Sequence, residues 1–324
     1  MCAFVPQSVA WPLDRAVLLV HGIGNASSSG AASFPRAELL AALGAGSRDV
    51  AIYTLNYDFI NDWAARKLQL AAGIQALGAA IAKRFASPDA SALLAEYCGD
   101  ILWPVLHQDT RFAIREAYMA QLDQIMSDCI ESMLPRGLDP RDARVSIIAH
   151  SLGCFHTYEA LHAAVNEPLH HLRPFSDGAQ LESVVLMASP VQMMRTIAGD
   201  IGALVPAANQ LATLDPRGLF IPAEPTSRKP KAATRKFISV TGTQDPVGGH
   251  LFGSRNDWAF MQMDGQVTHI VQQSLVAGNP VESLTVALEG GAAGSDLAGA
   301  VIKDPHSWSD YMTSQGALLA QVLA

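Results

Sequence analysis

Short apolar runs alternate along the chain with longer segments of helical periodicity. The runs at 15–20 (RAVLLV) and 144–149 (RVSIIA) carry almost no polar alternation, which is typical of strands covered on both faces of a parallel sheet. Comparable runs lie at 49–55, 181–188, 236–241 and 283–288. Because helical segments separate most of these runs, the pattern predicts an α/β fold with a mainly parallel, doubly wound sheet flanked by helices.

Three segments between the runs have helical spacing. Residues 155–165 follow the run at 144–149 directly, and residues 110–134 form a longer helix that Pro135-Arg136-Gly137 ends. The apolar stripe of that longer helix consists of Ile114, Tyr118, Leu122, Ile125, Met126, Ile130 and Met133. Residues 60–85 have apolar positions at helical spacing; they fit a helix packed on the sheet, a cap over a cleft, or peripheral contact with a membrane or micelle.

No internal repeat or shift in composition divides the 324 residues, so we expect a single domain over 1–324. The segments 60–104 and 189–235 are long for simple connections, and we predict that they are cap or lid insertions. The second is rich in proline and ends in a cluster of basic residues. Such a cluster is usually a solvated face.

Composition narrows the class of protein. Hydrophobic residues make up 49% and charged residues 16%, which allows a large core and argues against global disorder. The net charge of −8 argues against a nucleic-acid partner, which needs a basic face. The four cysteines form no CxxC pair, so neither a zinc site nor a thioredoxin-like motif is indicated, and we expect no cofactor. The first residues resemble no signal peptide, and we expect a cytoplasmic protein.

The run at 144–149 leads into Ala149-His150-Ser151-Leu152-Gly153. A strand, a tight turn with a serine at its tip and a helix form a nucleophile elbow, which needs small residues two before and two after the serine. Gly153 matches the usual G-x-S-x-G pattern, and Ala149 replaces its first glycine. From this motif alone, an ordinary strand-to-helix turn with a surface serine is an equal alternative.

A second turn, His21-Gly22-Ile23, follows the run at 15–20. A dinucleotide loop would require glycine at position 27, where Ser27 stands, and a P-loop would require Gly-Lys-Ser/Thr. The sequence instead favours an oxyanion loop in which the backbone N–H of Ile23 points into a pocket. A flexible glycine turn is the alternative. We predict that His21, Gly22 and His150 contact the substrate.

Sites in open α/β sheets form at the carboxyl ends of strands. Ser151, Asp245 and His306 each follow a predicted strand, and their order of nucleophile, acid and histidine is that of the α/β-hydrolase fold. A serine hydroxyl needs a histidine to take its proton, and the imidazole needs a carboxylate to hold one tautomer. The N–H groups of Leu152 and Ile23 are the predicted oxyanion donors.

Other residues compete for two of these roles. Asp304 lies only two residues before His306 and follows no clear central strand. His250 lies too close to Asp245 to follow a later strand, and His269 lies in an apolar run that favours packing. We therefore predict Asp245 as the acid and His306 as the histidine.

These motifs in this order resemble those of lipase/esterase-type serine hydrolases of the α/β-hydrolase superfamily. Gly99-Asp100-Ile101, followed by a long helix and the elbow, more distantly resembles DDHD-type phospholipases and uncharacterised bacterial hydrolases. The resemblance implies hydrolysis of a small-molecule or lipid carboxylic ester through a Ser151 acyl-enzyme, with His306 as general base and Asp245 as orienting acid. A serine at the elbow argues against dehalogenases and epoxide hydrolases, which use a carboxylate. A thioesterase, a phospholipase or a non-catalytic binding protein of the same fold are the alternatives.

Overall fold

A parallel sheet forms the centre of the computed structural model. The structure describes residues 13, 15–22, 50–55, 57, 60, 108–166, 181–191, 234–242, 281–286, 311 and 319. Within them the strands are β1 (Arg15–Val20), β2 (Val50–Leu55), β3 (Arg144–His150), β4 (Leu181–Met187), β5 (Thr234–Gly242) and β6 (Val281–Val286). Each predicted strand is therefore confirmed, with its ends displaced by no more than two residues.

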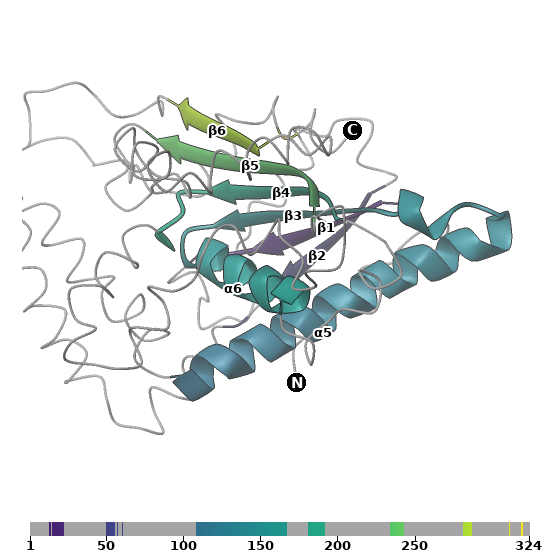
Figure 1. Ribbon diagram of the computed structural model, residues 1–324, viewed down its shortest axis with the longest axis horizontal. Coiled ribbons are helices and arrows are strands. Elements are labelled where there is room, and N and C mark those ends of the chain that lie inside the picture. The colour runs from purple at the N-terminus through teal and green to yellow at the C-terminus, as the bar shows by residue number, and fades with distance from the viewer. Residues whose placement is uncertain are drawn as a thin grey trace, which may run out of the picture.

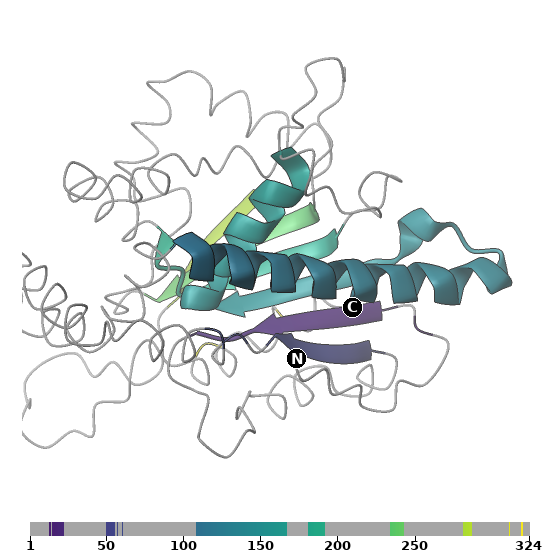
Figure 2. The same ribbon diagram turned by 90° about the horizontal axis from the view of Figure 1, so that it is seen from below.

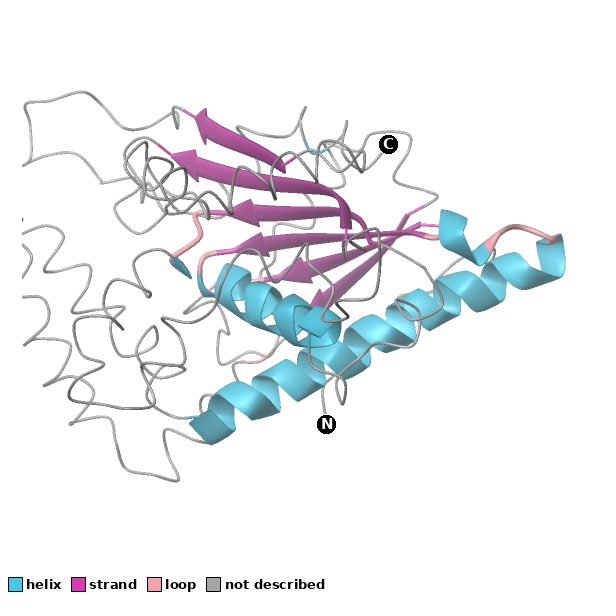
Figure 3. Cartoon of the chain, viewed as in Figure 1, coloured by secondary structure: helices cyan, strands magenta, loops and turns pink. Residues whose placement is uncertain are grey.

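The strands lie in the order β2-β1-β3-β4-β5-β6, and every neighbouring pair is parallel. All the arrows in Figure 3 accordingly point the same way. From β1 the chain goes to the edge strand β2, and it then returns past β1 to β3 before continuing outward to β6. The direction of progress therefore reverses between β1 and β3. In open α/β sheets, such a reversal opens a crevice at the carboxyl ends of the two strands, where ligands bind.

Two helices cover one face of this sheet. Helix α5 spans Gln108–Met133 and helix α6 spans Leu152–Asn166; they pack on each other and on β1 and β3 (Figures 1 and 2). The predicted stripe of α5 is buried except at Ile130, which is half-buried, while Cys129 beside it is fully buried. The short 3-10 helix η2 (Leu134–Arg136) follows, and Gly137 with φ 70° ends it. A glycine adopts this left-handed backbone at no steric cost.

Polar groups also fix how α5 and α6 pack. The side chains of Arg111 and Glu159 form a buried ion pair, with 2.7 Å between Nε and Oε1. The Tyr118 hydroxyl donates to Thr157 Oγ1 at 2.9 Å, and Thr157 donates in turn to the carbonyl oxygen of Gly153 at 2.8 Å. Buried polar groups need such partners to offset their lost hydration. These bonds therefore favour a single register between the two helices.

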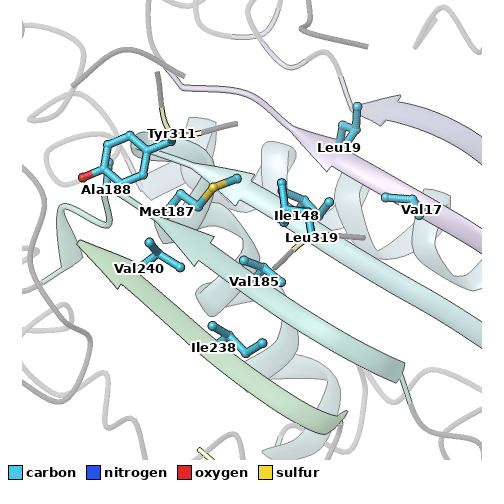
Figure 4. Close-up of a cluster of buried hydrophobic side chains, with 10 residues drawn as sticks. All are labelled: Val17, Leu19, Ile148, Val185, Met187, Ala188, Ile238, Val240, Tyr311 and Leu319. Atoms are coloured by element: carbon cyan, nitrogen blue, oxygen red, sulfur yellow. The ribbon is translucent and has the colours of Figure 1, made fainter. Parts of the chain in front are cut away.

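Tyr311 and Leu319, from the C-terminal part of the sequence, pack against the opposite face of the sheet. A buried apolar cluster there joins strand residues to Tyr311 and Leu319, both helical and fully buried. Figure 4 shows Tyr311 beside Ala188 and Met187 at the carboxyl end of β4. The strand members are Val17, Leu19, Ile148, Val185, Met187, Ala188, Ile238 and Val240. Because both faces are covered, the strands carry the continuous apolar runs seen in the sequence.

Nearly all of the two predicted insertions, residues 60–104 and 189–235, lies outside the described residues. Their assignment as cap or lid, and the single domain over 1–324, stay predictions. No helix in the described part of the chain is both long enough and apolar enough to cross a membrane.

Candidate active site

Ser151 occupies a strained turn between β3 and α6. Its φ is 52°, a left-handed conformation that costs a residue with a Cβ about 1–2 kcal/mol. Strand β3 ends at His150 and α6 begins at Leu152, so the reversal of the chain falls on this one residue. Such strain persists only where the surroundings enforce it, and it is concentrated at functional sites. The predicted elbow is therefore present in the backbone geometry.

The neighbouring strand β4 holds this turn in place. The backbone N–H of Ser151 donates to the carbonyl oxygen of Met187 at 3.0 Å, and its carbonyl oxygen accepts from the N–H of Cys154 at 2.9 Å. The thiol of Cys154 also donates to the Met187 oxygen, at 3.2 Å. Three bonds thus tie the turn to the last residue of β4 and to the first turn of α6.

Gly153 explains why the second small residue of the elbow pattern is required. A Cβ at this position would lie 2.4 Å from the carbonyl oxygen of His21 and 2.6 Å from that of Val20. Both obstacles are backbone atoms, which cannot rotate away. The first turn of α6 therefore lies directly against the end of β1, and only glycine fits between them.

Gly22, in the turn after β1, lies against Ser151. A Cβ on Gly22 would lie 2.5 Å from the Cβ of Ser151, 3.1 Å from its Oγ and 3.2 Å from Nδ1 of His150. The turn after β1 and the elbow after β3 are thus in contact, as the reversal of strand order requires. A bare glycine backbone beside a serine hydroxyl is the arrangement that an oxyanion loop needs.

His21 is buried at the start of this turn. Its ring Nδ1 donates to the carbonyl oxygen of Gly22 at 2.5 Å, a contact that places the proton on Nδ1. Burial lowers the pKa of His21 to about 4, and the bond to Gly22 opposes that shift. The imidazole is therefore neutral at pH 7, stacked on the ring of Tyr57 with centroids 4.5 Å apart.

His150 is also buried, and its ring packs edge-on against Tyr311 with centroids 5.7 Å apart. The contacts of His21, Gly22 and His150 described here are with other parts of the protein. Their predicted contact with a substrate stays a prediction. Tyr311 comes five residues after His306 in the sequence, and its own side chain lies beside His150, the last residue of β3 before the elbow.

A second left-handed turn lies beside the first one and was not anticipated. Ala188, directly after β4, has φ 55°, and its N–H donates to the carbonyl oxygen of Val240 at 3.0 Å. The following Ser189 is buried, and its Oγ accepts from the N–H of Val191 at 3.4 Å. The small residues Ala188-Ser189-Pro190 after an apolar run were the available signal.

Electrostatics at the elbow favour an anion. Ser151 directly precedes α6, so the elbow lies at the positive end of the helix dipole, where negative charge is stabilised. Among the residues the structure describes, no group of three His, Cys, Asp or Glu side chains could hold a metal ion. Ile23, Asp245 and His306 lie outside the described residues. Their roles stay predictions, as does the catalytic role of Ser151.

Comparisons with known proteins give only a distant structural similarity. No protein-family model matches the sequence, and no curated protein matches it significantly. Among solved structures, a lipase/esterase from Lactobacillus plantarum is similar with a TM-score of 0.37 and 14% identity, over 99% of this chain and 91% of that one. Esterase B from Lactobacillus rhamnosis is similar with a TM-score of 0.37 and 11% identity, over 95% and 76% of the two chains.

The class of fold follows from the chain's own topology. The parallel sheet with its reversal between β1 and β3 places a glycine turn and a serine elbow side by side. The described part of this protein has a doubly wound, parallel α/β fold, with the strand, serine turn and helix that a nucleophile elbow requires.

Proposed function

We propose that this protein is a serine hydrolase that cleaves carboxylic esters. The observation that carries the proposal is Ser151 at φ 52°, with the backbone of Gly22 against its hydroxyl. A serine in this setting is presented at the tip of a tight turn, beside N–H donors and the positive end of a helix. These features serve attack on a carbonyl carbon and stabilisation of the oxyanion that results.

The mechanism assigns two proton transfers, both through His306, to each half of the reaction. His306 takes the proton of the Ser151 hydroxyl as Oγ bonds to the ester carbonyl carbon, and Asp245 orients the imidazole. The tetrahedral intermediate then collapses, and the alcohol leaves with the proton from His306. Water, deprotonated by the same imidazole, then attacks the acyl carbon. As the second tetrahedral intermediate collapses, His306 returns the proton to Ser151 Oγ and the carboxylic acid is released. The N–H groups of Leu152 and Ile23 stabilise both oxyanions.

The positions of the partner residues in the sequence are compatible with this scheme. Asp245 comes three residues after Gly242, which ends β5, two strands from the elbow strand. His306 comes five residues before Tyr311, whose buried ring contacts His150. Five residues span at most about 18 Å of extended chain.

Covalent labelling tests the nucleophile. A fluorophosphonate probe is expected to label the wild-type protein and not Ser151→Ala. Ser146→Ala is the matched control, because it removes a buried hydroxyl from β3, the strand that leads into Ser151; that hydroxyl accepts from Ser183 Oγ at 2.8 Å. Equal labelling of Ser151→Ala would refute the assignment. A wild-type protein that is folded but unlabelled would favour a non-catalytic binding protein of the same fold.

Kinetics with esters of graded acyl chain length, with and without micelles, define the substrate. We expect hydrolysis of small-molecule or lipid esters. A rise in rate above the critical micelle concentration would indicate a lipid substrate. Thioesters and phospholipids in the same series test the thioesterase and phospholipase alternatives. If an Asp245→Asn variant kept full esterase activity, the role of the orienting acid would have to be assigned to another residue.

A further inference from the structure

Tyr57 holds the turn after β1 by two separate contacts. It lies two residues beyond β2, the strand next to β1 in the sheet. Its hydroxyl donates to the carbonyl oxygen of His21 at 2.8 Å. Its ring also stacks on the imidazole of His21, with centroids 4.5 Å apart and 1° between the planes. One side chain thus restrains both the backbone and the ring of His21.

The side chain of His21 in turn restrains the carbonyl group of Gly22. Its Nδ1 donates to the carbonyl oxygen of Gly22. In a trans peptide the C=O and N–H point in opposite directions, so a bond that fixes this oxygen also limits where the opposing N–H is directed. That N–H belongs to Ile23, the predicted oxyanion donor, which itself lies outside the described residues.

Helix α6 braces Tyr57 from a second side. The ring of His156 meets that of Tyr57 edge-on at 4.6 Å between centroids, and it contacts the ring of Phe155 at 5.4 Å. His156 and Tyr57 are both 1% exposed. Aromatic pairs of this kind favour one geometry beyond their buried area. The stack therefore connects the helix that begins at the elbow with the turn that faces it.

We propose that Tyr57 is a positioning residue that sets the oxyanion loop relative to Ser151. The inference rests on the proposed function, because the loop matters only if an oxyanion forms beside it. Tyr57 is buried and acts through His21 and Gly22. Catalysis by oxyanion donors depends on their being placed before the reaction begins, so loss of the tyrosine acts on the transition state more than on substrate binding.

Steady-state kinetics with Tyr57→Phe and Tyr118→Phe test the catalytic consequence. Tyr118→Phe is the matched control, since it also removes a buried hydroxyl, one that is bonded to Thr157 and not to His21. For Tyr57→Phe we expect kcat to fall about fivefold, the factor that corresponds to one hydrogen bond, with KM nearly unchanged. Tyr57→Leu, which also removes the stack, is expected to lose roughly 100-fold. Equal kcat values for the two phenylalanine variants would overturn the proposal.

Hydrogen exchange gives a readout that does not depend on activity. The peptide covering residues 18–24 is expected to exchange faster in Tyr57→Phe than in Tyr118→Phe, at similar thermal stability of the two variants. No difference between them would contradict the positioning role even if the wild-type enzyme were active. If the wild-type protein shows no Ser151-dependent labelling, the proposed function fails, while faster exchange in Tyr57→Phe still supports the hold of Tyr57 on the turn.

Discussion

Replacing Gly22 by alanine tests the contact between the two turns that make the site. The new Cβ would lie 2.5 Å from the Cβ of Ser151 and 3.1 Å from its Oγ. Nonbonded carbons prefer about 3.5–4.0 Å, so the two turns must separate by on the order of 1 Å. No rotation about χ1 of Ser151 relieves the clash, because the nearer atom is its own Cβ.

A displacement of this size should lower the reaction rate strongly and the free energy of unfolding moderately. Misplacing reacting groups by about 1 Å costs on the order of 10²-fold in rate, or about 2.7 kcal/mol in the activation barrier. Overpacking a buried contact costs about 1–3 kcal/mol of the free energy of unfolding. We therefore expect Gly22→Ala to fold and to lose most of its rate of fluorophosphonate labelling and of ester hydrolysis.

Gly137→Ala is the control for the change of residue type. Gly137 has φ 70°, and a Cβ there would meet nothing within 4 Å. We expect Gly137→Ala to lose about 1 kcal/mol of the free energy of unfolding through backbone strain, with no change in its labelling rate. The rate constant for inactivation by the probe and the free energy of unfolding in urea are measured for both variants. A Gly22→Ala protein that is labelled at the wild-type rate would refute the proximity of the two turns.

Three further variants test the elbow and its surroundings. Ser151→Gly should be about 1 kcal/mol more stable to urea than Ser151→Ala, because glycine relieves the strain at φ 52°; equal stability would mean that the turn is relaxed. Gly153→Ala should lose about 3 kcal/mol in the same assay, because its Cβ meets two backbone oxygens at 2.4 and 2.6 Å; a loss below about 1 kcal/mol would place α6 farther from β1. Burial lowers the pKa of His156 from 6.5 to about 3, with His21 and Arg111 adding to the shift. Between these values the unfolded chain binds the proton and the folded one does not, so stability falls as pH drops below 6.5. From pH 7.5 to 5.5 this histidine costs about 1 kcal/mol, and His156→Phe should remove that part of the pH dependence, whereas an unchanged slope would show that His156 is hydrated.

The sequence by itself determined the elements of this protein. Strands buried on both faces of a parallel sheet are apolar at nearly every position, so the runs at 15–20 and 144–149 identify them without any tertiary information. The turn at Ser151 needs small neighbouring residues, and Gly153, two residues further on, shows this requirement in the sequence itself. Gly137 likewise marks the end of the helical segment before it. These requirements arise within a few residues of one another, which is why a pattern can reveal them.

The arrangement of the site was decided only by the tertiary structure. Nothing in the spacing of Gly22 and Ser151 requires contact; the order β2-β1-β3 brings them together, because strand order is set by pairings between distant segments. Tyr57 gave no signal in the sequence, since a tyrosine two residues after a strand has no motif and acquires its role from His21 and His156. The serine turn and the glycine turn could be predicted from local sequence, whereas the contacts between them depend on which strands become neighbours.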